Sequence, residues 1–437
     1  MITAHQLVER ALSSGARDAE ICRDSIIRKE VFFEKNEIKS IRADERTDWG
    51  VRAFIGGRAG FASTNDVSML EETVDEAARI ARASDDDPFN GLPASERVYP
   101  VSGLVDEKEV SLSEIVSAGI KLVETAKKYD ARISVDSAAF SWEKYEVEIV
   151  SSQGIACRQQ RTMTSYFIMG VAVSANDVSS FDYSENIGIR WDQTTENIEK
   201  DAIRFAKAVK DSLGARPVPA FTGFALLSPE TSVMIPSLIN FLVNARNVQE
   251  RRSRFAGKLG QKIASEMFTL IDDPEEPETV WSRAFDREGV PARKMPIITG
   301  GVLDTFIYDT YAGRKHGRKS TGHASGSAAS APSISLHAPK LMPTHHLSEL
   351  WKMVERGVYI RRFSGNADPV SGIISGLVKG GRYIEDGSAI FPVTDTMIHL
   401  NLDSLFNGIC AVSYEKEPTF AGCLPYVLVQ NVDILGK

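Results

Sequence analysis

The placement of the histidines is the feature of this chain that most suggests a metal-binding or catalytic site. Six of the seven histidines lie in the C-terminal half, at positions 316, 323, 337, 345, 346 and 399, so a metal cluster is conceivable there. No histidine is followed by glutamate, however, and the H-E-x-x-H motif that binds zinc through two imidazoles on one helix is absent. The pair His345–His346 has no spaced carboxylate or cysteine partner, and it is more typical of a solvated turn than of two ligands.

The sequence also lacks the other common hydrolytic and nucleotide-binding motifs. There is no G-x-S-x-G elbow to expose a nucleophilic serine, no Walker A loop and no G-x-G-x-x-G. Ser141 and Lys144 match S-x-x-K, but the surrounding residues predict a strand, which does not bring these two side chains together as a helix does. Neither a serine hydrolase nor a nucleotide-binding protein is indicated.

A tract of small residues at 320–335 contains His323 and follows Arg318 and Lys319. Glycine and serine allow another backbone segment to approach closely, and binding residues are often carried on loops. Apolar strands are predicted on both sides, so two interpretations are open: a flexible linker, or a loop that lines a cleft. In a cleft, His323 would be able to bind a carboxylate or a backbone carbonyl group.

The acidic balance of the chain argues against nucleic acid as a direct partner. The chain carries 51 Lys and Arg against 59 Asp and Glu, a formal net charge of −8, whereas phosphate binding requires a basic face. The basic runs are short and fit a solvated surface or a local anion site. They comprise Arg251, Arg252, Arg254 and Lys258, and then Arg314, Lys315, Arg318 and Lys319.

Cysteine usage and the N-terminal residues predict a cytoplasmic protein. The four cysteines form no C-x-x-C pair, which disfavours both a disulfide framework and a zinc ribbon. Residues 1–6 lack the basic and apolar regions of a secretion signal, and no stretch approaches 18 uncharged apolar residues. We therefore expect neither export nor a membrane partner.

Sequence periodicity predicts one supersecondary unit that occurs twice in the first 215 residues. Each copy opens with an amphipathic helix and a capping box, Thr3 with Gln6 and Ser111 with Glu114. Each copy ends with a helix, one starting at Ser68 and the other covering residues 195–212. Between them lie β-like runs at 19–24, 27–34, 37–42 and 48–63, and at 133–140, 145–151, 155–160 and 162–174.

The C-terminal half has a different pattern. Residues 222–227 predict a buried strand, and a helix with an apolar face starts at Pro229. Gly300–Gly301 and Asp386–Gly387 separate apolar runs and are hairpin signals, because such turns need positive φ. The expected fold class is α+β, with a duplicated helix–β-meander–helix N-terminal half and a mostly antiparallel β C-terminal domain with a few helices. The predicted domains are residues 1–104, 105–216 and 217–437.

Several segments of the last 220 residues resemble the TldD/PmbA family and specifically its PmbA (TldE) branch, and a looser resemblance extends back to about residue 5. The most specific is Lys319-Ser-Thr-Gly-His-Ala, and the others are 252–262, 285–291, 300–303, 312–315, 376–387 and 422–429. The resemblance implies a cytoplasmic heterodimeric peptidase, with the older label modulator of DNA gyrase, in which a TldD subunit carries zinc on an H-E-x-x-x-H helix. A TldD-like subunit with its zinc and a peptide substrate are therefore the expected partners.

The segment of this chain that corresponds to the zinc-binding helix runs from Ser228 to Met234. Pro229 and Met234 stand where the resemblance places the two histidines. Neither replaces an imidazole, because proline has no side-chain donor and a thioether is too soft a ligand for Zn²⁺. Glu230 remains, without a metal-bound water to activate. Cys410 lies near the position of a cysteine ligand in the metal-binding subunit, but a buried structural thiol is the other interpretation.

We therefore expect no catalytic residue and no metal in this chain, which would be the metal-free subunit of a heterodimeric TldD/TldE zinc metallopeptidase. It would close the active-site chamber and help bind an extended peptide by strand addition at a sheet edge. Arg314, Lys319 and His323 are the predicted substrate-binding residues, since they offer charge-assisted donors to a peptide. Two alternatives remain open: a homodimeric scaffold that binds peptides without cleaving them, and an independent hydrolase with an unrecognised site.

Overall fold

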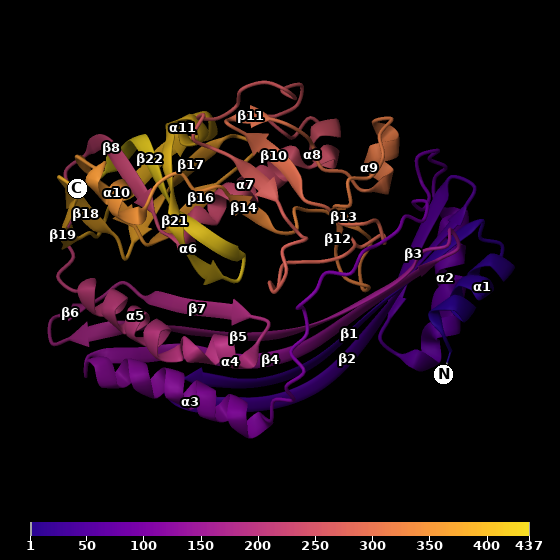
Figure 1. Cartoon of the computed structure of the whole chain (residues 1–437), viewed down its shortest axis with the longest axis horizontal. Coiled ribbons are helices and arrows are strands. Elements are labelled where there is room, and N and C mark those ends of the chain that lie inside the picture. Colours follow the sequence, from indigo (N-terminus) through magenta and orange to yellow (C-terminus); the bar gives the residue numbers. More distant parts are fainter. Residues whose placement is uncertain (1, 437) are drawn as a thin grey trace.

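The computed structural model describes residues 2–436, which form three layers (Figure 1). A long, curved antiparallel sheet from the N-terminal half is the middle layer. Helices cover its outer face, and the C-terminal half lies on its inner face. The predicted α+β class, with mostly antiparallel sheets, is confirmed.

The N-terminal sheet joins the two predicted repeats. Its strand order is β3-β2-β1-β4-β5-β6, with β7 also paired to β5, and the two repeats meet where β1 pairs with β4 from Glu20–Ser151 to Glu34–Ser137. The domain boundaries at residues 104 and 216 stay a prediction. The seven strands are β1 (Asp18–Glu34), β2 (Glu37–Ile55), β3 (Arg58–Thr64), β4 (Ile133–Ser151), β5 (Ala156–Ser174), β6 (Asp177–Val178) and β7 (Asp182–Gly188).

Strand alternation gives this sheet two different faces. On β1, Ile21, Val31 and Phe33 are buried against the helices, whereas Glu20 and Asp24 bond to the C-terminal half. Both predicted capping boxes are present at the first turns of α1 and α3. The helices of this half are α1 (Ala4–Ser13), the 3-10 turn η1 (Val67–Met69), α2 (Leu70–Ala83), α3 (Leu112–Tyr129), α4 (Trp191–Glu196) and α5 (Ile198–Asp211).

Several predicted boundaries in this half are wrong. The runs 19–24 and 27–34 are one strand, as are 133–140 with 145–151, because polar residues that interrupt the apolar alternation still pair across the sheet. Ser25, for example, bonds Thr47 at 2.8 Å between the side-chain oxygens. The helix expected from Ser68 begins at Leu70, because Asp66 caps the preceding 3-10 turn and Ser68 donates to its carboxylate.

The C-terminal half contains three sheets, and both predicted hairpins are present at Gly300–Gly301 and Asp386–Gly387. Strands β8 and β15 pair in parallel, while the other named strands of the described chain pair antiparallel. The nine-stranded sheet has the order β16-β17-β20-β22-β8-β15-β18-β19, with β21 paired to β22. Its strands are β8 (Phe221–Leu227), β15 (Arg356–Ile360), β16 (Arg362–Ala367), β17 (Ile373–Lys379), β18 (Arg382–Glu385), β19 (Ser388–Pro392), β20 (Met397–Asn401), β21 (Ile409–Thr419) and β22 (Gly422–Leu435).

The two smaller sheets and the helices surround one large apolar core. The four-stranded sheet has the order β11-β10-β9-β14, so β14 lies at its edge. The smaller strands are β9 (Leu270–Asp272), β10 (Met295–Thr299), β11 (Val302–Leu303), β12 (Ala324–Ser325), β13 (Ser333–Ile334) and β14 (Pro339–Leu341). The helices are α6 (Pro229–Ser232), α7 (Met234–Val243), α8 (Ala245–Gln249), α9 (Thr310–Lys315), α10 (Leu347–Lys352) and α11 (Leu402–Gly408).

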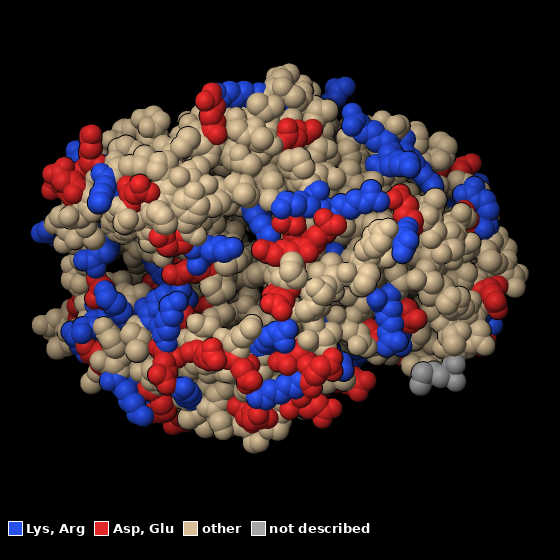
Figure 2. Space-filling view, in the orientation of Figure 1, with Lys and Arg blue, Asp and Glu red and all other residues tan. Residues whose placement is uncertain are grey.

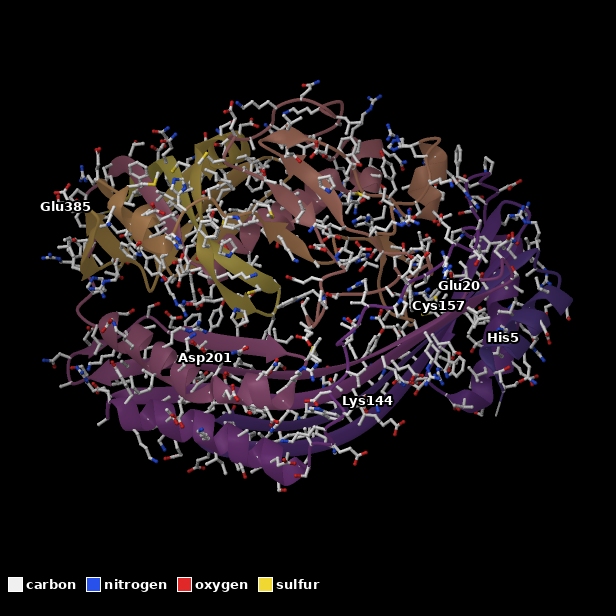
Figure 3. All side chains as sticks on the ribbon, in the orientation of Figure 1. His5, Glu20, Lys144, Cys157, Asp201 and Glu385 are labelled. Atoms are coloured by element: carbon white, nitrogen blue, oxygen red, sulfur yellow. The ribbon has the colours of Figure 1, made fainter. Side chains whose placement is uncertain are left out.

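A buried ion network joins the two halves. Glu20 on β1 receives two bonds from Arg52, at 3.0 and 2.5 Å, and one from Arg287 at 2.7 Å, while Arg52 also bonds Glu288 at 2.8 Å. Figure 3 shows Glu20 at this junction, next to Cys157 of β5. Charges of both signs are interspersed over the visible surface, which is hollowed between the two halves (Figure 2). Within residues 2–436, no helix combines the length and apolar character needed to cross a membrane.

Candidate functional site

The segment predicted to replace a zinc-binding helix is a short turn of helix held from both sides. Ser228 caps α6 by accepting from the backbone N–H of Thr231, and Pro229 occupies the first turn, where a missing N–H costs nothing. The Ser228 hydroxyl also donates to the backbone carbonyl of Arg361 at 2.6 Å. These contacts fix Glu230 in the interior, facing the strand end at Arg361.

Glu230 forms a buried ion pair with Arg361. Their side chains are 4% and 6% exposed, and Arg361 Nη1 lies 2.5 Å from Glu230 Oε1. Desolvation raises the pKa of Glu230 against the opposing effect of Arg361. Arg361 also lies 3.5 Å from Asp182 on β7, and it donates to the Tyr183 carbonyl at 3.1 Å. The one carboxylate that the zinc-binding motif leaves in this segment is thus paired with a guanidinium group.

The residues around α6 do not fit a zinc ion. Pro229 and Met234 offer no imidazole, and the charge of Arg361 repels a cation. Burial raises the pKa of the Cys410 thiol to about 11, and the thiol donates to the Leu428 carbonyl at 3.3 Å, as expected for a structural thiol. Across residues 2–436, no three His, Cys, Asp or Glu side chains are grouped so that they could hold a metal ion.

The structure does not bring the three predicted substrate-binding residues together. Arg314, at the end of α9, donates to the carbonyls of Asn90 and Leu92 at 3.1 and 2.6 Å. Lys319 is exposed, and its ammonium group has no hydrogen bond or ion pair with a described residue. His323 is 1% exposed and therefore lies inside the protein.

His323 and His337 form a buried pair that fixes the small-residue tract. Their rings stack with centroids 5.3 Å apart, and His323 Nε2 lies 3.2 Å from Asp272 Oδ2. Burial holds the pKa of His337 well below its ordinary value, so the neutral ring donates from Nε2 to the Gly322 carbonyl at 2.8 Å. The tract is thereby attached to the four-stranded sheet.

The other end of the tract rests on the N-terminal sheet. The backbone N–H of Ala328 donates to Asp24 at 2.6 Å. A Cβ at Gly50 would lie 2.0 Å from the Ala328 carbonyl oxygen, so glycine is needed there for this close approach. Between its two anchors, residues 325–327 line a cavity. Of the two interpretations of this tract, the loop that lines a cleft is therefore the one observed.

Edge strands of three sheets border a second hollow, which we call the strand-edge groove. β7 and β14 each pair on one side only within the described chain, and β21 pairs with β22 and makes one further bridge, between Ser413 and His345. They surround a cavity of about 290 Å³ whose wall is completed by residues 276–281. Its lining includes Gly188, Lys340, Lys416 and Cys423. Sequence reasoning missed this groove, because its walls come from segments more than 50 residues apart and none carries a local motif.

The β21–β22 hairpin brings the groove against the N-terminal sheet. Glu417 pairs with Arg204 of α5, and the backbone N–H of Phe420 donates to Glu185 of β7 at 3.0 Å. In Figure 1 this hairpin reaches down toward β7. The C-terminal half therefore contributes β14, β21 and residues 276–281 to the groove, and the N-terminal sheet contributes β7, an arrangement that suits an extended chain running between strand edges.

Comparison with known proteins covers nearly the whole chain. Models of the PmbA/TldA metallopeptidase match with domain 1 at residues 19–83, the central domain at 106–210 and the C-terminal domain at 225–436. Metalloprotease PmbA of Escherichia coli O157:H7 is 24% identical over 441 residues, which cover 98% of this chain and 94% of that protein. A metalloprotease TldD homolog of Haemophilus influenzae is 24% identical over 375 residues, covering 79% and 74%. The crystal structure of TldE from Thermococcus kodakarensis superposes with a TM-score of 0.91 at 21% identity, over 99% of both chains.

Proposed function

The chain belongs to the PmbA/TldA metallopeptidase family, and we propose that it is the metal-free, TldE-like subunit of a heterodimeric TldD/TldE zinc metallopeptidase that acts on peptides in the cytoplasm. In this proposal a TldD-like partner supplies the zinc and the catalytic residues. This chain closes the active-site chamber and helps bind the substrate.

The buried pair between Glu230 and Arg361 is the observation that carries the proposal. A glutamate that assists a metal-bound water must face that water, whereas here it faces a guanidinium group at 2.5 Å. Pro229 and Met234 add no metal-binding nitrogen to the same segment. Family membership together with this pair supports a division of labour between two subunits.

The strand-edge groove supports the substrate-binding part of the proposal. An extended peptide gains affinity from main-chain hydrogen bonds to an unpaired strand edge. β7 offers such an edge, as does β21 beyond its bridge at Ser413, and Lys416 lies exposed beside them without an ion-pair partner among residues 2–436. We propose that the peptide lies along these edges, with its carbonyl groups near Lys416.

The substrate-binding role of Arg314, Lys319 and His323 stays a prediction. We propose that the three residues contribute to it in different ways. Lys319 is exposed with a free ammonium group, so it is the member that would meet a substrate or partner directly. Arg314 bonds the loop at Asn90 and Leu92, and buried His323 lies against Asp272. Those two residues would act by holding the loop that carries Lys319.

Co-expression with a TldD-like protein from the same genome tests the proposal. We expect the pair to co-purify, to bind zinc in the partner and to cleave peptides, while the isolated chain binds no stoichiometric zinc in elemental analysis. Matched glutamate variants sharpen the test. Glu→Gln in the partner's H-E-x-x-x-H motif should abolish cleavage, whereas Glu230→Gln should leave the pair active.

Stoichiometric zinc in the isolated chain, or peptide cleavage by it in the presence of a chelator, would contradict the proposal. A chain that forms a stable homodimer, binds peptides and ignores every TldD-like protein would instead support the scaffold function. Size-exclusion chromatography with light scattering, with and without the candidate partner, separates these outcomes.

A further inference from the structure

A cavity between the two halves has an unusual charge arrangement, and we call it the arginine cavity. Its volume is about 490 Å³, and it shares no lining residue with the strand-edge groove. Arg161 contributes from β5, Arg283 and Arg287 from the loop before β10, and residues 325–327 from the small-residue tract. Tyr145 and Arg161 are directly paired residues of β4 and β5, which puts both on the inner face of the sheet.

Arg161 and Arg283 are half-buried and Arg287 is buried, and each has a buried nitrogen without the partner that an enclosed guanidinium group requires. Arg283 makes no side-chain hydrogen bond or ion pair with any described residue. Arg161 has a single hydrogen bond, from Nη1 to the Val280 carbonyl at 2.6 Å, and its Nε is buried without a partner. Arg287, which is 5% exposed, bonds Glu20 but keeps a buried Nη2 with no acceptor.

The charges of Arg161 and Arg283 are only partly compensated, by Asp272 and Asp286 near Arg283 and by the Tyr145 ring, which lies 5.8 Å from the Arg161 guanidinium carbon. Desolvation and the nearby Arg283 together lower the pKa of Arg161 to about 10, and desolvation also lowers the pKa of Arg283. Two guanidinium groups thus repel each other beside a cavity. Such an arrangement costs stability unless an anion occupies it.

The carboxylates in and around the cavity are already engaged. Asp24 accepts from the Tyr145 hydroxyl at 2.8 Å and from the Ala328 N–H. Glu143 pairs with Arg28 at 2.6 Å. Asp286 accepts from three backbone N–H groups, those of Glu288, Val290 and Ala324. Asp272, on β9, accepts from the backbone N–H groups of two residues and faces His323.

We propose that the arginine cavity binds the carboxylate group of a peptide or amino acid, with Arg161 and Arg283 as the anion-binding side chains. A guanidinium fork matches a carboxylate in two parallel hydrogen bonds. The volume suits a small ligand, and Val147, Met163 and Phe285 provide apolar wall for its hydrocarbon part. Asp24 lines the same cavity, which disfavours a doubly charged phosphate more than a singly charged carboxylate. The inference concerns the isolated chain and does not rest on the proposed function.

Isothermal titration calorimetry on the full chain tests this inference with defined probes. The probes are N-acetyl-Ala-Ala-Phe with a free carboxylate, its C-terminal amide, N-acetyl-Ala-Glu-Ala amide and inorganic phosphate. We expect the free acid to bind at least about tenfold more tightly than its amide, the loss expected for a charge-assisted bond. Comparable binding of the glutamate peptide would assign the site to a side-chain carboxylate, whereas its weaker binding would assign the site to a chain end.

Matched arginine variants locate the binding site. Arg283→Gln and Arg161→Gln should each lower the affinity for the free-acid peptide by at least about tenfold. Arg79→Gln, at a position 75% exposed, should leave its affinity unchanged. Removal of the repulsion with Arg161 should also raise the Tm of the ligand-free Arg283→Gln variant, a signature that a merely structural arginine would not give.

Equal affinity for acid and amide, or no binding of the acid at millimolar concentration, would overturn the inference. Tighter binding of phosphate than of every carboxylate probe would do the same, and so would unchanged affinity in both cavity variants. The acid–amide comparison uses the wild-type chain, so it decides the question even if a variant fails to fold.

Discussion

Replacing Glu230 by methionine should destabilise the protein strongly, because it leaves Arg361 buried with a weaker set of partners. Arg361 would keep Asp182 at 3.5 Å and the Tyr183 carbonyl at 3.1 Å, but lose the 2.5 Å contact. Breaking a buried ion pair in this way costs about 3–5 kcal/mol. At about 2–4 °C per kcal/mol for a unit of 150–250 residues, we expect the Tm to fall by about 6–20 °C.

Differential scanning calorimetry and urea unfolding of the single variants Glu230→Met and Arg361→Met, and of the double variant, measure this cost. The double variant should be less destabilised than the sum of the singles by about 1–3 kcal/mol, because both singles lose the same contact. Glu266→Met is the matched control. Glu266 contacts Lys262 at 2.6 Å but is 78% exposed, so its removal should not shift the unfolding midpoint measurably. If Glu230→Met behaves like Glu266→Met, the pair is not the buried contact on which the reasoning depends.

Three further predictions concern pH, the strand-edge groove and metal. Burial, reinforced by Glu288, raises the pKa of Asp286 from 3.8 to about 8, so its contribution to stability is complete at low pH and is lost as pH rises toward 8. The Tm of wild type should therefore fall relative to that of Asp286→Asn between pH 5 and pH 8. A difference in Tm between the two proteins that stays constant over this range would contradict the prediction. Cys423→Phe should fill the groove and lower peptide turnover by the reconstituted pair at least about tenfold while the chain stays folded. Unchanged turnover would show that the peptide does not bind in this groove. A chelator should leave the Tm of the isolated chain unchanged, since no metal-binding cluster is present in residues 2–436, and a drop of several degrees would reveal one.

Local sequence signals predicted the elements whose formation depends on local chemistry. The capping boxes at Thr3 and Ser111 and the turn at Gly300–Gly301 are present, because the groups that form them lie within a few residues. The prediction divided long strands into shorter ones, because a polar residue such as Ser25 interrupts the apolar pattern. In the structure Ser25 lies within a strand and its hydroxyl forms a hydrogen bond with Thr47 of the neighbouring strand. That partner is set by register, which alternation alone does not provide.

The candidate sites depended more on tertiary contacts. The sequence indicated that Glu230 lacks imidazole neighbours, but Arg361 lies 131 positions away and no pattern connects the two residues. His323 looked available on a loop, yet it is buried because His337 and Asp272 approach it from another segment. The two arginines of the cavity likewise come from β5 and a distant loop, and their lack of partners becomes visible only in the folded chain.

The pairing of β1 with β4 has a consequence for how the chain can be cut. Residues 84–111 connect α2 to α3 without a helix or strand and are exposed at 94–97, whereas the hydrogen-bonded ladder from Glu20 to Glu34 holds the two N-terminal repeats together. A protease nick in that connection should therefore give two bands in denaturing electrophoresis but one particle in gel filtration. The two fragments should also assemble when they are synthesised as separate polypeptides, so the covalent continuity of this half is dispensable for its architecture.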